Sequence, residues 1–287
     1  MHLQKLKKSL KKDLRTKRNK SRWPQRSAIL LLVLMTAGAG GLIWKGRRPA
    51  QLLDQGIRFE QQDRLNEALE RYTRLYQGYA ASEQAAEALY RSGRILQLDR
   101  GENQQALLCY LQLENDYPRS PLVIQAQQEA AELTKHRLDD CGQAIPIYQR
   151  LIDEVESNAD HYQYEIADCY ARLENWSQAA IEFEALVASD PPQEMKAMAI
   201  FRLAEARLLT GQRAAAKAGY QQLVKEYPKL LLTQEARFRL AELLEEEEHL
   251  SQALQAYSEL TDYPRQDLVK QKIINLKKRM ARKKKVL

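Results

Sequence analysis

Glycine and proline are scarce in this chain of 287 residues, which has 11 glycines and 9 prolines. Aromatic residues make up only 7% of it, and runs of β-branched residues are few. This argues against a β-sheet protein, because strands are enriched in β-branched and aromatic side chains. Ala, Glu, Leu, Arg, Lys and Gln dominate instead, and these residues favour helix. The composition therefore predicts an all-α fold.

Residue patterns that carry catalysis are also missing. There is no HExxH or CxxC motif and no glycine-rich loop between a strand and a helix. The four histidines are scattered: His2, His136, His161 and His249. The acidic run Glu245–Glu248 before His249 is interpreted as a solvated helix end rather than a metal site. We therefore expect no enzymatic activity, no cofactor and no metal.

The three cysteines, Cys109, Cys141 and Cys169, are odd in number and lie in no known motif. Two interpretations stay open for an exported protein. Cys141 and Cys169 could form a disulfide, or the cysteines could be small buried residues, which is the favoured interpretation for Cys109 and Cys169.

Charge is strongly segregated along the chain, which has a formal net charge of +7. Residues 1–26 contain eleven Lys or Arg and one acidic residue, and residues 270–285 contain nine bases and no acid. The body between residues 49 and 269 is acidic, with 22 bases and 37 acids. A nucleic-acid-binding core is disfavoured, because its basic footprint would lie on the folded surface.

One long apolar run lies near the N-terminus, SAILLLVLMTAGAGGLIWKG at residues 27–46. Its 18 residues from Ser27 to Trp44 would form roughly 27 Å of helix, close to the ~30 Å hydrocarbon thickness of a bilayer. More bases precede the run than follow it. The positive-inside rule then predicts a transmembrane signal anchor at 27–45, with residues 1–26 in the cytoplasm and the rest exported.

Alternatives to this anchor stay open. The small residues around Gly38 could form a signal-peptide cleavage site, and residues 1–20 could be a mitochondrial-type presequence. The basic leader could also lie on anionic lipid as an amphipathic helix. Ala37 and Gly41 form a small-xxx-small pair that would suit a homodimer.

A repeated phrase dominates the rest of the chain. Alanine is followed four residues later by an aromatic residue and three residues after that by leucine, in six copies spaced by 35 to 38 residues. We call these the anchor triplets: Ala68/Tyr72/Leu75, Ala106/Tyr110/Leu113, Ala144/Tyr148/Leu151, Ala179/Phe183/Leu186, Ala216/Tyr220/Leu223 and Ala253/Tyr257/Leu260. A near-constant period of this length predicts a stacked array of two-helix units.

Each unit also has a small residue 12 or 13 positions before its anchor alanine. These residues are Gly56, Gly93, Ala131, Ala167, Ala204 and Ala241. They are expected to let the first helix of a unit approach the second closely. Proline ends four of the units, at Pro118, Pro191, Pro228 and Pro264.

This pattern of Gly/Ala, Ala, Tyr/Phe and Pro resembles the tetratricopeptide repeat (TPR) over roughly residues 49–267. The segment LENDYPRSPLVIQAQQEA resembles the "YP-x-S" form of bacterial envelope TPR proteins. The resemblance implies a TPR-like α-solenoid of about six repeats at 46–267, followed by a basic capping helix and tail at 268–287. It implies a partner-binding protein but does not name the partner.

Two units depart from the pattern. Unit 3 has Pro146 inside its second helix and Glu156 in place of the terminal proline, which predicts a bend or a shortened helix and weaker packing there. Unit 2 carries an extra residue, assigned to its DRGEN turn.

The resemblance also implies a binding groove, because the first helices of TPR units line the concave face. A protein or peptide partner would contact residues that flank the small positions. The candidates are Tyr90, Arg94, Glu132, His136, Tyr164, Asp168, Arg172, Phe201, Glu205, Phe238 and Glu242. The aromatic members could instead pack between helices, which is slightly favoured. The charged members are expected to be exposed, because a packed seam would not neutralise them.

In the C-terminal tail, Leu268, Ile273, Ile274 and Leu276 are expected to be buried as a cap. Its lysines could contact anionic lipid, another anionic polymer or the acidic body of the array.

The sequence therefore predicts a single-pass protein of the bacterial inner membrane, with its repeats in the periplasm, that acts as a scaffold or adaptor. A secreted soluble adaptor and a regulatory subunit of an envelope enzyme remain alternatives.

Overall fold

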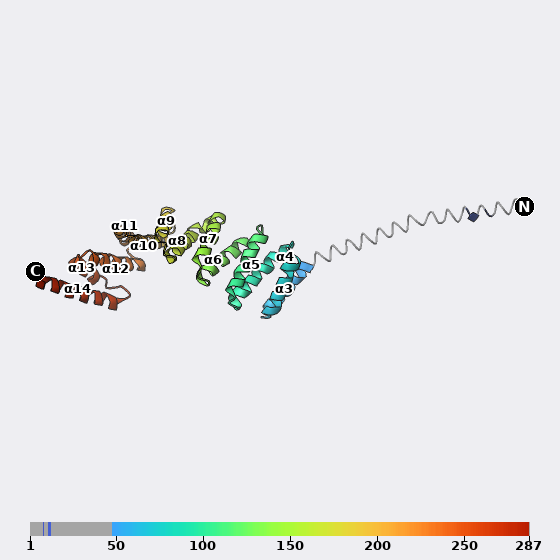
Figure 1. Cartoon of the computed structure of the whole chain (residues 1–287), viewed down its shortest axis with the longest axis horizontal. Helices are drawn as coiled ribbons and strands as arrows, with labels where there is room; N and C mark the ends of the chain where they lie inside the picture. The colour runs from blue at the N-terminus through green and yellow to red at the C-terminus, as the bar shows by residue number, and fades with distance from the viewer. Residues whose placement is uncertain (1–7, 9–10, 13–47, 287) are drawn as a thin grey trace. The chain divides into compact units, whose positions relative to one another are not determined.

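The computed structural model describes residues 8, 11–12 and 48–286, which are helical except for short connections (Figure 1). The predicted anchor at 27–45 and the rest of the leader at 1–26 lie outside these residues. No helix among the described residues is long and apolar enough to cross a membrane. The chain divides into two compact parts, which we call the N-terminal unit, ending at Ile95, and the C-terminal unit, beginning at Leu96, and each is described separately. Units with a number are the two-helix repeats of the sequence.

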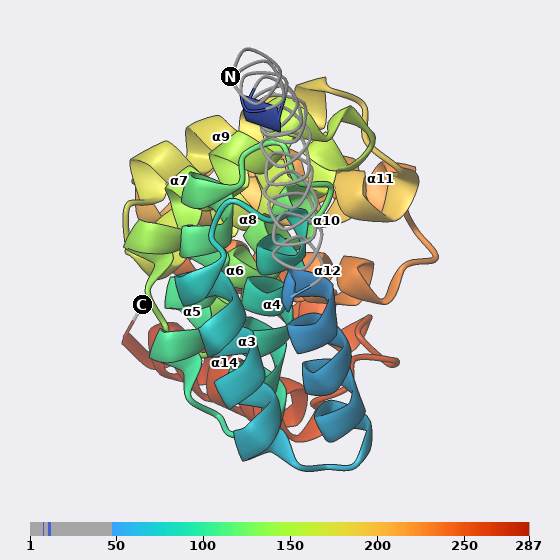
Figure 2. The same cartoon turned by 90° about the vertical axis from the view of Figure 1, so that its right-hand side faces the viewer.

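The N-terminal unit contains a helix at residues 48–61, followed by α3 (Leu65–Gly78) and α4 (Glu83–Arg94). The first helix and α3 lie side by side (Figure 2). Gly56 makes this contact possible, because a Cβ atom at residue 56 would lie 2.3 Å from Cε1 of Tyr72. The small residue predicted at this position is therefore required by the packing.

The π-helical turn η1 (Ile95–Asp99) follows α4 directly. A π-turn takes one more residue than an α-turn, because its hydrogen bonds join residues i and i+5. The additional residue of unit 2 is thus accommodated in η1, next to the DRGEN turn to which the sequence assigned it.

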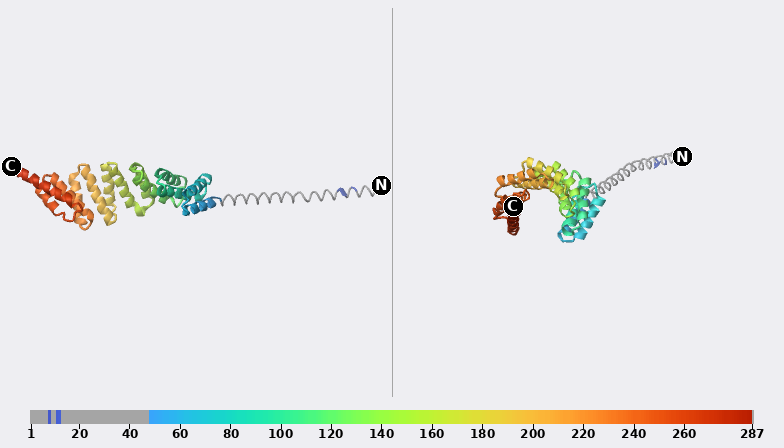
Figure 3. Two further views of the ribbon diagram at one scale, coloured as in Figure 1. Left: turned by 90° about the horizontal axis from the view of Figure 1, so that it is seen from below. Right: turned by 60° about the vertical axis from the view of Figure 1, so that its left-hand side comes forward.

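The C-terminal unit is a series of antiparallel helices, each packed on the helices before and after it in the chain (Figure 3). The α-helices are α5 (Asn103–Asp116), α6 (Val123–His136), α7 (Cys141–Glu154), α8 (Ala159–Arg172), α9 (Trp176–Ala188), α10 (Gln193–Leu209), α11 (Arg213–Glu226), α12 (Leu231–Glu246), α13 (Leu250–Ser258) and α14 (Gln266–Val286). A short 3₁₀ turn, η2 (Glu156–Asn158), precedes α8.

The anchor triplets form the core, as predicted. Every member lies on the second helix of its unit or directly after it, and none is more than 2% exposed. Each unit thus removes an aromatic ring and a leucine from water, which stabilises the packed pair of helices. The alternation of first and second helices confirms the all-helical TPR-like solenoid.

The turn inside each unit has a regularity that the sequence analysis missed. One residue with positive φ stands five positions before every anchor alanine: Asp63, Gly101, Asp139, Glu174, Gly211 and Glu248. The next N–H then donates to a carbonyl near the end of the first helix, as from Asn175 to Tyr170 at 2.9 Å. This is a Schellman-type cap, which normally prefers glycine at the left-handed position.

The expected shortening around Pro146 is wrong. Helix α7 passes through Pro146 and has 14 residues, as α5 and α11 do. Pro146 is exposed, as is Gly142, whose carbonyl oxygen loses the Pro146 N–H as its partner and faces water instead. Tyr148 and Leu151 are 1% and 0% exposed, so their burial gives no sign of looser packing.

The C-terminal cap is only partly as predicted. Leu276 is fully buried, and Leu268 and Ile273 pack against the core as half-buried residues. The prediction for Ile274 is wrong, because its side chain is 52% exposed. The apolar stripe of α14 instead follows Val269, Ile273, Leu276 and Met280, which share one helix face.

Candidate partner-binding surface

The aromatic residues of the first helices pack mainly within their own units. Phe201 meets Tyr220 with ring centroids 5.6 Å apart, and Phe238 meets Tyr257 at 5.5 Å. Phe201 and Phe238 are 7% and 2% exposed. These two rings therefore stabilise the helix pairs and offer no free face to a partner.

Tyr164 and Tyr90 are more accessible. Tyr164 lies half-buried with its ring 5.6 Å from that of Phe183 in an edge-on arrangement. Burial raises the pKa of Tyr164, so its hydroxyl stays neutral at physiological pH. Tyr90 is also half-buried, on α4 of the N-terminal unit. Part of each ring thus remains available on the first-helix face.

The charged candidates Asp168, Glu205 and Glu242 are only 21%, 24% and 25% exposed. The expectation that they are freely exposed is wrong, because basic side chains from neighbouring first helices neutralise them. Arg202 of α10 pairs with Asp168 of α8 at 2.7 Å and with Glu205 at 3.2 Å.

The pairs continue along the first helices of the C-terminal unit. Arg239 of α12 lies 3.8 Å from Glu205 and 3.0 Å from Glu242, and Lys272 of α14 lies 3.2 Å from Glu242. We refer to this set as the ion ladder: Lys135, Asp168, Arg202, Glu205, Arg239, Glu242 and Lys272. Each cation joins two neighbouring helices, so the ladder fixes the spacing of the first-helix layer.

Lys135 of α6 is the most buried member of the ion ladder, with 2% of its side chain exposed. Its ammonium group lies 2.5 Å from Glu165 and 2.7 Å from Asp168. Burial opposes the charge of Lys135, but the hydrogen bonds that Lys135 donates to Asp168 and Glu165 outweigh it and raise the pKa of the lysine. Burial likewise opposes ionisation of Asp168, yet Lys135 and Arg202 lower the pKa of that carboxyl.

The sequence contains a signal for Lys135 that was overlooked. Lys135 stands four residues after the small residue Ala131, where unit 4 has Ala171, which is 4% exposed. Helical spacing places this position on the packed face. A lysine there requires carboxylate partners, which Glu165 and Asp168 supply from the next first helix.

Three charged candidates of the C-terminal unit remain accessible. Glu132 and His136 lie one turn apart on α6, with 49% and 50% of their side chains exposed, and approach to 3.3 Å. Glu132 also accepts the hydroxyl of Tyr148 at 3.1 Å. Arg172 is 37% exposed and pairs with Asp139 in the turn after α6. These residues form the exposed polar part of the predicted surface in this unit.

Arg94 differs from these residues because it is exposed and has no hydrogen-bond or ion-pair partner among the described residues. Arg91, one turn earlier on α4, pairs with Glu60 at 3.2 Å and with Glu87 at 2.8 Å. Arg94 is thus the candidate whose charge is available without breaking a contact.

The acidic run at the end of α12 is occupied by cations of α14. Glu245 lies 2.9 Å from Arg279, and Glu248 lies 2.7 Å from Arg279 and 2.5 Å from Lys283. The basic tail therefore neutralises part of the array's own acidic body, which was one of the three expectations for it. Among the residues that the structure describes, no group of His, Cys, Asp and Glu could hold a metal ion.

The cysteines are free in the structure. Cys141 and Cys169 are 3% and 0% exposed, and Cys109 is half-buried. Burial raises the pKa of Cys109 to about 11. Burial, together with a hydrogen bond involving Cys141, raises the pKa of Cys169. The buried thiol of Cys169 is therefore protonated and lies close to Cys141, which suits the interpretation of Cys169 as a small buried residue.

Comparison with known proteins agrees with this architecture. A family model described as tetratricopeptide repeat matches residues 87–120 and 198–229, and a second model with the same description matches residues 137–194. The chain therefore contains tetratricopeptide repeats. Proteins with this fold generally act as scaffolds for protein–protein interaction. No curated protein sequence matches the chain.

Several solved structures are similar in fold. A TPR protein from Parabacteroides merdae is 15% identical, with coverage of 80% of this chain and 99% of that one and a TM-score of 0.48. YrrB, described as a TPR protein with an unusual peptide-binding site, is 15% identical over 64% of this chain and 89% of its own, with a TM-score of 0.46.

The Naa15/Naa10 complex bound to HypK-THB contains a chain that is 15% identical, with a TM-score of 0.50. The match covers 83% of this chain but only 35% of that one. At such low identity this last match shows the fold alone.

Proposed function

We propose that this chain is a membrane-anchored scaffold or adaptor that binds protein or peptide partners on the first-helix face of its repeats. The observation that carries the proposal is the unequal use of the two helices of each unit. Anchor triplets on the second helices are at most 2% exposed, whereas the first helices present Arg94, Glu132 and His136 to solvent. A partner can contact Arg94 and His136 without displacing a core residue, and Glu132 is accessible although it also accepts the Tyr148 hydroxyl.

Charge reversal tests this surface. Arg94→Glu and the double variant Glu132→Lys, His136→Glu are compared with the wild type for partners crosslinked in membranes and identified by mass spectrometry. Asp153→Lys on the second helix α7 is the control, because Asp153 is also exposed and has no partner among the described residues. We expect loss of a specific partner in the first two variants only. If all four proteins capture the same partners, the first-helix face is excluded as the binding surface.

We propose further that the apolar run 27–45 anchors the repeats on the periplasmic side of a bacterial inner membrane. The charge bias around that run supports this orientation. A topology reporter fused after Leu287 tests it, since cytoplasmic activity of the reporter would contradict it. A mature N-terminus near Gly40 would instead support a secreted adaptor. Co-purification of an enzymatic activity would support a regulatory subunit.

Contact of the C-terminal helix with anionic lipid remains part of this proposal. Lys270, Lys277, Lys278 and Arg282 are exposed on α14 and have no partner among the described residues. Charge removal in the double variant Lys277→Gln, Lys278→Gln should weaken salt-sensitive membrane association while leaving the ion pairs of Arg279 and Lys283 intact. The variant Asp267→Asn serves as a control on the same helix.

A further inference from the structure

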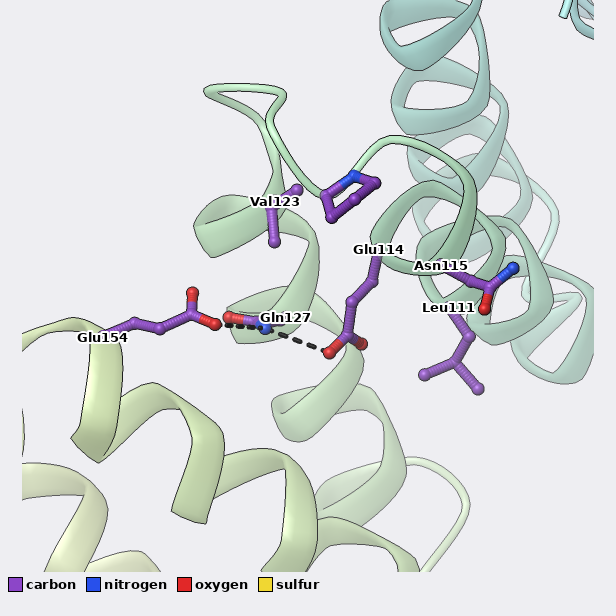
Figure 4. Close-up of a pocket in the computed structure, with 7 residues that line it drawn as sticks. Leu111, Glu114, Asn115, Val123, Gln127 and Glu154 are labelled. Atoms are coloured by element: carbon purple, nitrogen blue, oxygen red, sulfur yellow. Dashed lines mark hydrogen bonds between the residues drawn. The ribbon is translucent and has the colours of Figure 1, made fainter.

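A cavity of about 430 Å³ lies at the junction of units 2 and 3. It is open to solvent and lies between the end of α5, the turn after it, the first turns of α6 and the end of α7 (Figure 4). It is lined by Leu111, Glu114, Asn115, Pro118, Val123, Gln127 and Glu154. The cavity contains none of the first-helix candidates, so it is a separate feature of the molecule.

The hydrogen-bond donors of the lining residues are already in use. Nε2 of Gln127 donates to Glu114 at 3.1 Å and to Glu154 at 3.4 Å (Figure 4). Nδ2 of Asn115 donates to Asp116 at 2.7 Å. Both N–H groups of the Gln127 amide are therefore occupied, and only its carbonyl oxygen is left for a ligand.

Two hydrogen-bond acceptors in the cavity, by contrast, have bonding capacity that the described residues do not use. Gln127 is 1% exposed, and its Oε1 atom has no hydrogen-bond partner among the described residues. Glu114 is paired with Arg150 at 2.6 Å, whereas Glu154 has no ion-pair partner in the described part of the chain. A buried carbonyl without a donor is costly, so this arrangement favours a ligand that supplies donors and positive charge.

Corresponding positions in the other units show that the polar lining is not required by the repeat. The residue after the anchor leucine is Glu114 here, but Tyr76, Ile152, Val187 and Val224 in four other units and Thr261 in unit 6, so a carboxylate stands there only in unit 2. Four residues before the small position stands Gln127 here, and Ile200 in unit 5, where it is 2% exposed in the core beside Val187. An apolar pair therefore fills the equivalent junction of units 4 and 5.

A second cavity, of about 460 Å³, lies at the junction of units 5 and 6 and provides an internal contrast. Its walls include Val224, Leu240 and Leu244, and it contains Arg237, which has no ion-pair partner among the described residues. That cavity has two basic residues, Lys217 and Arg237, beside one carboxylate, Glu259, whereas the first has two carboxylates and no basic residue. A basic ligand would thus distinguish between them by charge.

We propose that the cavity around Gln127 binds a lysine or arginine side chain of a partner protein. The aliphatic stem lies against Leu111, Pro118 and Val123, and the charged head group donates to Glu154 and to Oε1 of Gln127. This division suits basic side chains, which combine an apolar stem with a head group that only donates hydrogen bonds. The site would add selectivity for a basic residue to whatever the first-helix face binds.

Saturation-transfer NMR on the full chain in neutral detergent tests the site with three probes: the N-acetyl methylamides of lysine, arginine and norleucine. We expect saturation of the two basic probes and at least fivefold weaker transfer to norleucine, which has the stem without the charge. Glu154→Gln and Gln127→Leu should each reduce transfer to the basic probes at least fivefold. The control is Glu156→Gln, which neutralises an exposed carboxylate outside the cavity and should leave saturation transfer to the basic probes unchanged.

Equal transfer to norleucine, or full transfer in both cavity variants, would overturn the proposal. Calcium chloride could abolish saturation transfer to the basic probes while sodium chloride at the same ionic strength does not. That result would indicate a metal site instead. Glu154→Gln keeps the test valid if Gln127→Leu misfolds, because Glu154 is exposed. Thermal melts are expected to show Gln127→Leu at least as stable as the wild type, since unit 5 places Ile200 at that position.

Discussion

The charges of the first helices are used differently in the two units of the chain. In the N-terminal unit, Arg91 pairs with Glu60 and Glu87 within that unit, and Arg94 is left exposed. In the C-terminal unit, Asp168, Glu205 and Glu242 at the position of Arg94 belong to the ion ladder, which links α6, α8, α10, α12 and α14, whereas Glu132 at the same position stays 49% exposed. The same position in the repeat can therefore stabilise the array or remain free for a partner.

The largest effect that tests this difference is expected from Lys135→Ala. This change leaves Glu165, which is 12% exposed, without its lysine, and removes one of the two cations that hold Asp168. Breaking a buried ion pair by removing one partner costs about 3–5 kcal/mol. In contrast, Arg91→Ala in the N-terminal unit should cost about 1 kcal/mol or less, because the pair is 30% exposed. Urea unfolding of both variants measures the difference.

Lys135→Met is the matched control, because methionine keeps much of the aliphatic stem and removes the charge. A variant as stable as the wild type would show that the stem, and not the ion pair, stabilises this junction. Hydrogen exchange should locate the loss in α6 and α8.

A smaller effect is expected from pH. The pKa of Asp168 is lowered in the folded protein, so its carboxylate contributes stability that is complete above its unfolded pKa of about 3.9. That contribution is lost as pH falls through the lower folded value. In Asp168→Asn the unfolding free energy should therefore depend less on pH below about pH 4 than in the wild type. Parallel acid titrations of both proteins check this, and identical slopes would contradict it.

The sequence alone predicted the helical array because its anchor triplets recur with a fixed spacing and include large buried rings. It did not predict the ion ladder, because pairing between units depends on how far each first helix is shifted along its neighbour. Arg202 meets both Asp168 and Glu205, and only the second is a neighbour on its own helix. Periodicity therefore identifies packed positions but not whether a charge near them is paired.

The hydrogen bonds of the anchor tyrosines were likewise not predicted from the periodicity. Tyr72 donates to Glu60 at 2.6 Å, Tyr110 to Gln97 at 2.6 Å and Tyr257 to Glu245 at 3.2 Å. Each acceptor stands four residues after the small residue of its unit, where unit 5 has Leu208. The hydroxyl of Tyr220 is accordingly buried without a partner among the described residues. These acceptors could have been found by comparing the units at that position.

Tyrosine-to-phenylalanine substitutions separate these cases. Tyr72→Phe should cost about 1.5 kcal/mol, because it removes a hydrogen bond to a carboxylate. Tyr220→Phe should be neutral or slightly stabilising, since phenylalanine already occupies the equivalent position as Phe183. Thermal unfolding of the two variants measures both effects. A loss of more than about 1 kcal/mol in Tyr220→Phe would mean that its hydroxyl has a partner, such as a buried water.

The smallest effects are expected at the turns within the units, where the left-handed position is glycine in two cases and acidic in four. Glu174 has φ 58° and an exposed side chain, so Glu174→Gly should relieve strain and raise stability by about 0.5–1 kcal/mol. Gly211→Ala, at φ 80°, should lower it by about 1 kcal/mol. Asp139→Gly should raise the free energy of unfolding less than Glu174→Gly does, because it also removes the ion pair with Arg172. Chemical denaturation of the three variants gives the ranking. An equal gain at residues 139 and 174 would show that the Asp139–Arg172 pair adds nothing to stability, and that Arg172 is held only by its hydrogen bond to the carbonyl of Lys135.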